Sequence, residues 1–60
     1  MDEANTRKEL ELCEQEMRRL QKVLQRDDLD LEARESTLRL IENVFNKTRD
    51  LRSLLATFDN

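Results

Sequence analysis

Four glutamates near the start of the chain have the spacing that a shared divalent cation would need. Among Glu9, Glu11, Glu14 and Glu16, Glu11 and Glu14 are three residues apart and Glu9 and Glu16 are seven apart, and each of these pairs lies on one face of a helix. Carboxylates placed in this way can share a hard cation such as Ca²⁺. On a solitary helix, however, acids beside an apolar stripe usually form a solvated face. We therefore predict no metal site and no cofactor.

Cys13 is the single cysteine of the chain and its one candidate for redox chemistry. It could form a disulfide between chains or respond to oxidation. The alternative is a structural role as a small buried hydrophobic residue, and the apolar positions around it favour that role. A lone cysteine also argues against a disulfide framework and fits a reducing compartment, so we expect an intracellular, cytoplasmic protein.

Arg18, Lys22 and Arg26 follow i, i+4, i+8 spacing and form one basic ridge on a helix. A DNA-binding basic helix carries a denser run of Lys and Arg than this. Acids surround the ridge, and Glu14 is placed to pair with Arg18. A solvated face is favoured over nucleic-acid or acidic-lipid binding, so we predict no nucleic-acid partner.

Residues that enzymes depend on are missing. The chain has no His, the commonest acid–base group, and no Gly, so no glycine-rich phosphate loop. We expect no enzymatic activity and no small-molecule substrate. No run approaches the roughly 18 apolar residues that a membrane span requires.

The composition indicates long helix. Of 60 residues, 37% are hydrophobic and 42% are charged, the formal net charge is −3, and there is no Pro. Thr6 and Glu9 match a capping box, which predicts a helix from near Thr6 to near Phe58. We expect residues 1–5 to form a disordered lead, 6–58 a coiled-coil segment, and 59–60 the C-terminal end.

A seven-residue repeat runs through this segment. Its first apolar column, position a, contains Leu10, Met17, Leu24, Leu31, Leu38 and Phe45. Its second column, position d, contains Cys13, Leu20, Asp27, Arg34, Ile41, Thr48 and Leu55. An apolar a column this regular is typical of a coiled coil, although d is interrupted.

The stretch QRDDLDLE, residues 25–32, interrupts the apolar pattern with four acids. The seven-residue spacing of Leu24, Leu31 and Leu38 passes through it, and no Gly or Asn lies between residues 21 and 42 to form a left-handed turn. Both facts favour one continuous helix, about 78 Å long at 1.5 Å per residue. The alternative is a hairpin broken near residues 27–30.

Two features bear on assembly. After Leu38 the apolar stripe widens, as expected of a bundle of three or four helices or a groove for a partner helix. Asp27 and Arg34 both occupy d, where a parallel dimer would oppose like charges and an antiparallel one would pair them. The predicted interface residues are Leu10, Cys13, Met17, Leu20, Leu24, Leu31, Leu38, Ile41, Val44, Phe45, Leu51, Leu55 and Phe58.

The sequence therefore predicts an all-α chain: a single, nearly continuous amphipathic helix in an antiparallel dimer or a four-helix bundle. Residues 6–58 resemble, in a generic way, the coiled-coil segments of cytoskeletal and other scaffold proteins. We expect an oligomerisation module that binds itself. The alternative is a heteromeric module whose residues 38–58 dock a different helical protein.

Overall fold

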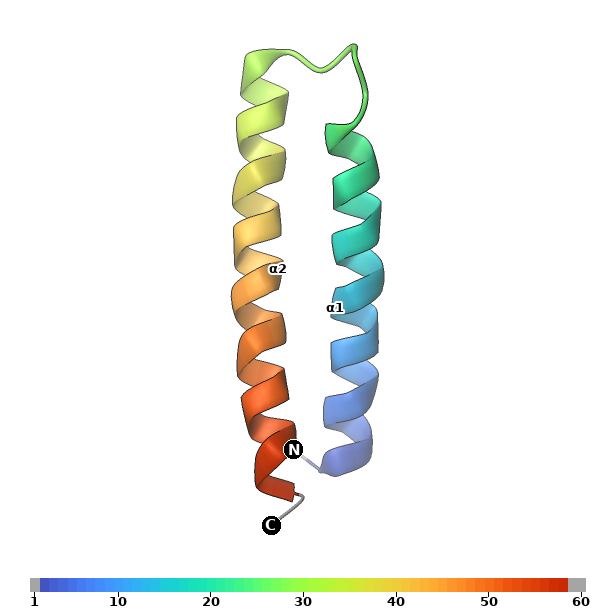
Figure 1. Ribbon diagram of the computed structural model, residues 1–60, viewed down its shortest axis with the longest axis vertical. Coiled ribbons are helices and arrows are strands. Elements are labelled where there is room, and N and C mark those ends of the chain that lie inside the picture. Colours follow the sequence, from blue (N-terminus) through green and yellow to red (C-terminus); the bar gives the residue numbers. More distant parts are fainter. Residues whose placement is uncertain (1, 59–60) are drawn as a thin grey trace.

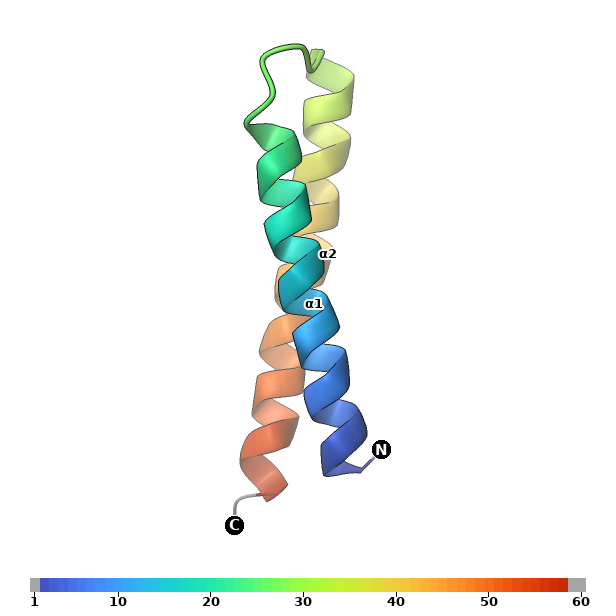
Figure 2. The ribbon, with the colours of Figure 1, turned by 90° about the vertical axis from the view of Figure 1, so that its right-hand side faces the viewer.

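The computed structural model shows two α-helices packed antiparallel in a hairpin (Figure 1). It describes residues 2–58, in which α1 spans Glu3–Leu24 and α2 spans Leu31–Phe58. The hairpin is 46 Å long and 14 Å across in the two other directions. Seen from the side, the two helices cross near their middle and separate toward both ends (Figure 2). The all-α prediction is confirmed.

The prediction of one continuous helix is wrong. The chain reverses direction over residues 25–30, so the molecule is far shorter than the 78 Å helix expected. The turn does not need Gly, because no described residue, including those of the loop, has a positive φ. This loop is built entirely from backbone conformations that any L-residue adopts easily.

Hydrogen bonds define both ends of the loop. At its start, Gln25 keeps a helical backbone and its N–H donates to the Lys22 carbonyl oxygen, while the Arg26 N–H donates to the Val23 carbonyl oxygen. At its end, the Asp30 carboxylate accepts a hydrogen bond of 2.7 Å from the Ala33 backbone N–H, which makes Asp30 the N-cap of α2. Backbone hydrogen bonds therefore close the last turn of α1, and an acid, Asp30, starts α2.

The start of α1 also differs from the prediction. Asp2 is the N-cap, and its carboxylate accepts a hydrogen bond of 2.7 Å from the Asn5 backbone N–H. Thr6 lies one turn inside the helix, where its hydroxyl donates to the Asp2 carbonyl oxygen. Residues 3–5 therefore belong to α1, whereas Met1, at the start of the predicted lead, and the predicted end 59–60 lie outside the described residues.

The two helices pack along a narrow contact, which we call the seam. In α1 its most buried residues are seven apart, at Thr6, Cys13 and Leu20. In α2 they are Thr37, Thr48 and Leu51. Three of these six residues are threonines, so the seam has little large apolar side-chain volume to bury.

The rotation of α2 about its own axis is the main departure from the predicted repeat. The side of α2 that faces the seam carries the d column, which includes Ile41 and Thr48. It also carries the neighbouring column that lies on the side of d away from a and includes Thr37 and Leu51. The a column lies at the edge of the seam and stays largely exposed: Leu38 is 50% and Phe45 60% exposed, against 3% for Leu20. A loop does not fix how the following helix is rotated about its own axis, so α2 need not continue the repeat of α1 in the same orientation.

Candidate assembly surface

More large apolar side chains lie on the surface of the hairpin than in its core. Among the described residues, the buried hydrophobic ones are Cys13, Leu20 and Leu51. The large hydrophobic residues that remain exposed are Leu12, Leu31, Leu38, Leu40, Phe45, Leu54 and Phe58. Exposed leucines are normal one at a time, but a contiguous set marks a surface that contacts something.

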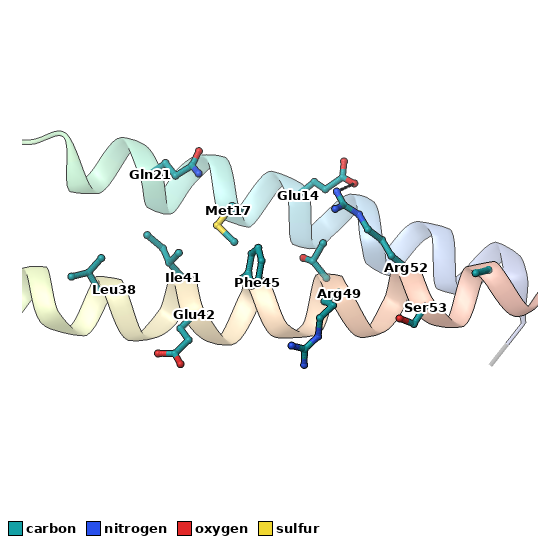
Figure 3. Close-up of a pocket in the computed structure, with 12 residues that line it drawn as sticks. Glu14, Met17, Gln21, Leu38, Ile41, Glu42, Phe45, Arg49, Arg52 and Ser53 are labelled. Atoms are coloured by element: carbon teal, nitrogen blue, oxygen red, sulfur yellow. Dashed lines mark ion pairs between the residues drawn. The ribbon is translucent and has the colours of Figure 1, made fainter.

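One such set forms a groove beside the seam. Its apolar lining comprises Met17 of α1 and Leu38, Ile41 and Phe45 of α2, and its volume is about 870 Å³. Figure 3 shows the side chains of Ile41 and Phe45 pointing from α2 toward Met17. We call this surface, with the exposed a column of α2 at its edge, the groove face.

Charged side chains of both signs border the groove face. Arg52 of α2 approaches Glu14 of α1 across the groove, with 3.7 Å between guanidinium nitrogen and carboxylate oxygen (Figure 3). Both side chains are largely solvated, so this pair contributes less than about 1 kcal/mol to stability. Glu42 and Arg49 point away from α1, on the outer side of α2 (Figure 3). Within the described residues Glu42 forms no ion pair, and Arg49 lies 3.6 Å from its neighbour Asp50.

A second, smaller hollow lies on the other side of the seam. It measures about 260 Å³ and is lined by Leu12, Cys13 and Val44, with Glu9, Glu16 and Lys47 around them. Leu40, Leu54 and Phe58 are also exposed. Each is 140–180° around α2 from Phe45 at about 100° per residue, and so on this opposite side. We call this side the back face.

The predicted interface residues divide into three groups in the structure. Cys13, Leu20 and Leu51 are buried in the seam. A second group is half-buried along it: Leu10, Met17, Leu24, Ile41, Val44 and Leu55. Leu31, Leu38, Phe45 and Phe58 are exposed. The single chain thus uses part of the predicted interface internally, and contact between chains stays a prediction.

Sequence reasoning missed the threonines of the seam. Thr6 was interpreted as a helix cap, yet it lies seven residues before Cys13, and this spacing places it in the d column. Thr37 and Thr48 lie eleven residues apart, which corresponds to three helical turns and therefore to one side of α2. The spacing of these threonines indicated a buried position, but threonine is polar and was not counted among the apolar residues of the repeat.

Asp27 and Arg34 do not lie on one continuous helix, because Asp27 is in the loop and Arg34 is in the first turn of α2. Asp27 lies exposed in the loop. Arg34 is half-buried, and its guanidinium donates a long hydrogen bond of 3.4 Å to the Leu24 carbonyl oxygen. A cation at this point satisfies one of the free carbonyls at the end of α1 and opposes the negative end of its dipole. The predicted pairing of Asp27 with Arg34 of a second chain assumed two continuous helices, and the hairpin does not contain such a helix.

Several acids and bases outside the seam form local pairs. The Arg19 guanidinium hydrogen-bonds the Glu16 carboxylate and holds the pKa of Glu16 below its ordinary value. In the loop, Arg26 makes two hydrogen bonds to Asp28, of 3.1 and 2.8 Å, and they lower the pKa of that carboxyl. This pairing takes Arg26 out of the predicted basic ridge.

Neither a metal site nor a membrane-spanning helix is found in the part of the chain that the structure describes. No group of three or more acidic, Cys or His residues among residues 2–58 is arranged to hold a metal ion. In the same range neither helix is apolar enough over its length to cross a membrane. No protein-family model, no curated protein and no solved structure matches the chain.

Proposed function

We propose that this chain is an oligomerisation module of a larger scaffold protein, and that it self-associates through its groove face. One observation carries the proposal: the seam inside the hairpin buries threonines, while Leu38 and Phe45 of α2 stay largely exposed. A hairpin optimised to be alone would place its largest apolar side chains inside, since their burial is the main source of stability.

The exposed area of the hairpin supports a second copy as the occupant. A compact monomer of this mass exposes about 4,100 Å² by the usual scaling. The hairpin exposes 4821 Å². The difference of roughly 700 Å² is close to the ~800 Å² that each partner buries in a stable protein–protein interface.

A second candidate function is the binding of a different helical protein along residues 38–58. The apolar residues of the back face, Leu40, Leu54 and Phe58, favour it, because self-association through the groove face leaves them uncovered. Sedimentation of the purified chain separates the two candidates. A discrete dimer supports self-association, and a monomer at all concentrations supports a different partner.

Two leucines of equal exposure provide a matched test of the proposed surface. Leu38 and Leu40 are each 50% exposed, but Leu38 lines the groove and Leu40 lies on the back face. Leu38→Asp should abolish self-association, because it would place a charge within an apolar contact at a cost of several kcal/mol. Leu40→Asp should leave the assembly intact.

Sedimentation equilibrium reports the assembly state, and circular dichroism shows whether each variant still forms its helices. Equal loss of assembly in the two variants, with helicity retained, would contradict the groove face as the contact. A wild-type chain that remains at 7.2 kDa would contradict self-association itself.

A further inference from the structure

We infer that two copies of the chain pack antiparallel, α2 against α2, about a twofold axis beside Phe45. This inference rests on the proposed function and adds the direction and register of the assembly. It depends on two features of α2: the apolar column on the groove face, and the order of the charges along its outer edge.

The apolar column has Phe45 near its centre. Leu38 lies seven residues before Phe45 and Arg52 seven residues after it, so all three share one side of α2. A twofold axis beside Phe45 sets its ring against the Phe45 ring of the second copy. The same axis sets Leu38 against Arg52 of the second copy, whose aliphatic stem can cover a leucine while its charged end stays in water.

The charges reverse in sign across the same centre. Glu42 precedes Phe45 by three residues and Arg49 follows it by four, and both point away from α1 (Figure 3). In the antiparallel register Glu42 lies opposite Arg49 of the second copy, and symmetry produces this pair twice. In a parallel twofold dimer the flanks of α2 that carry Glu42 and Arg49 would lie on opposite edges of the contact, so neither pair could form.

Packing of this kind also completes the groove. The Phe45 ring of the second copy enters between the helices beside Met17 and Ile41, which line the groove with Phe45 itself. Two hairpins joined in this way form a four-helix bundle, with both α2 helices at the contact and both α1 helices outside it. The four large apolar side chains of each groove then leave water together.

Charge reversal tests the register. Glu42→Arg and Arg49→Glu, made singly, each convert two attractive pairs into two repulsive ones, so each should raise the Kd roughly tenfold. The double variant restores opposite charges and should return the Kd to near the wild-type value. Raising the salt concentration to about 0.5 M should shrink the single-variant defects, because it screens exposed charges.

Lys47→Glu is the matched control for Arg49→Glu. Lys47 lies two residues away and lines the hollow of the back face, so its reversal should leave the Kd unchanged. Single variants that behave like the wild type would overturn the antiparallel register, because parallel helices hold these side chains on opposite edges of the contact and form no pair between them. A double variant as weak as the single ones would overturn the Glu42–Arg49 pairing.

Cross-linking gives a direct measure of direction. Cys13 is the only cysteine, so Cys13→Ala provides a background in which E42C and R49C chains react only at the new thiol. With a short bismaleimide, a mixture of the two chains should yield cross-linked pairs, and each chain alone should yield few. Self-linking of E42C alone would overturn the inference.

The same samples separate failure of the inference from failure of the proposed function. A dimer in sedimentation that forms neither cross-link would overturn the register and leave self-association standing. A monomer in sedimentation would overturn both.

Discussion

The two sides of α2 carry opposite kinds of residue. The side that packs on α1 buries Thr37 and Thr48, and the groove face exposes Leu38 and Phe45. Small side chains let two helices approach closely, but they bury little apolar area. Large exposed side chains contribute stability only when something covers them. The seam therefore sets the shape of the hairpin, and the groove face carries the apolar area whose burial by a partner would add stability.

The largest expected difference in stability is between a leucine of the seam and a leucine of the groove face. Leu20→Ala removes a side chain that is 3% exposed in the seam and should lower the free energy of unfolding by about 2–5 kcal/mol. Leu38→Ala should change the unfolding of the dilute monomer by less than about 0.5 kcal/mol. Chemical denaturation at low protein concentration measures both changes. A similar loss in the two variants would show that the groove face is part of the monomer's own core.

The seam threonines differ from one another in their hydrogen bonds. The Thr37 hydroxyl donates to the Ala33 carbonyl oxygen at 2.8 Å, whereas the buried Thr48 hydroxyl has no hydrogen-bond partner within the described residues. Thr48→Val should therefore raise the free energy of unfolding by about 1 kcal/mol, because it removes an unsatisfied polar group from the seam. Thr37→Val, the control, should leave it unchanged or lower it. Thermal melts compare the two, and a loss at Thr48 would contradict this reading of the seam.

The loop determines which side of α2 meets α1, so its cap is the next point to test. Asp30→Ala removes the carboxylate that caps α2 and should cost about 1 kcal/mol of stability. Asp27→Ala is the control, since Asp27 lies exposed in the same loop and no helix depends on its side chain for capping. Denaturant titration followed by circular dichroism measures the difference. Equal effects would mean that charge in the loop matters more than capping.

The smallest expected effect is a pH dependence at the loop. Hydrogen bonds from Arg26 lower the pKa of Asp28 below its ordinary value of 3.8. The carboxylate is thus favoured in the folded state, and its contribution is present above pH 3.8 and is lost as the pH falls through the lower folded value. Asp28→Asn should therefore lower the melting temperature slightly near neutral pH and leave it unchanged in strong acid. A difference between the two chains that persists in strong acid would contradict this assignment.

The sequence predicted the helical class, because composition and apolar spacing report directly on helix. The turn was missed for a physical reason. Leu24 and Leu31 keep seven-residue spacing across a break in the chain, so the periodicity looks the same with or without the loop. Asp30 was the available signal: an acid immediately before an apolar-periodic segment is a good N-cap even without Gln or Glu three residues later.

The groove face was beyond prediction because it depends on how far α2 is rotated after the loop. The apolar a column and the mixed d column of α2 both suited a helix contact, and the pattern favoured the more apolar one. The hairpin instead buries Thr48 and leaves Phe45 outside. Only the packing of the two helices shows that the stronger stripe is available to a second chain.

The two phenylalanines test this account most directly, because they are the only aromatic residues and lie on opposite faces. Phe45 borders the groove face and Phe58 lies on the back face. NMR of the two rings, with a dissolved paramagnetic agent and protein concentrations spanning the assembly transition, reports the solvent exposure of each. We expect the Phe45 ring to become protected as the chain assembles while the Phe58 ring keeps its exposure. Protection of Phe58 with Phe45 unchanged, or no change at either ring, would contradict the assignment of the groove face as the assembly surface.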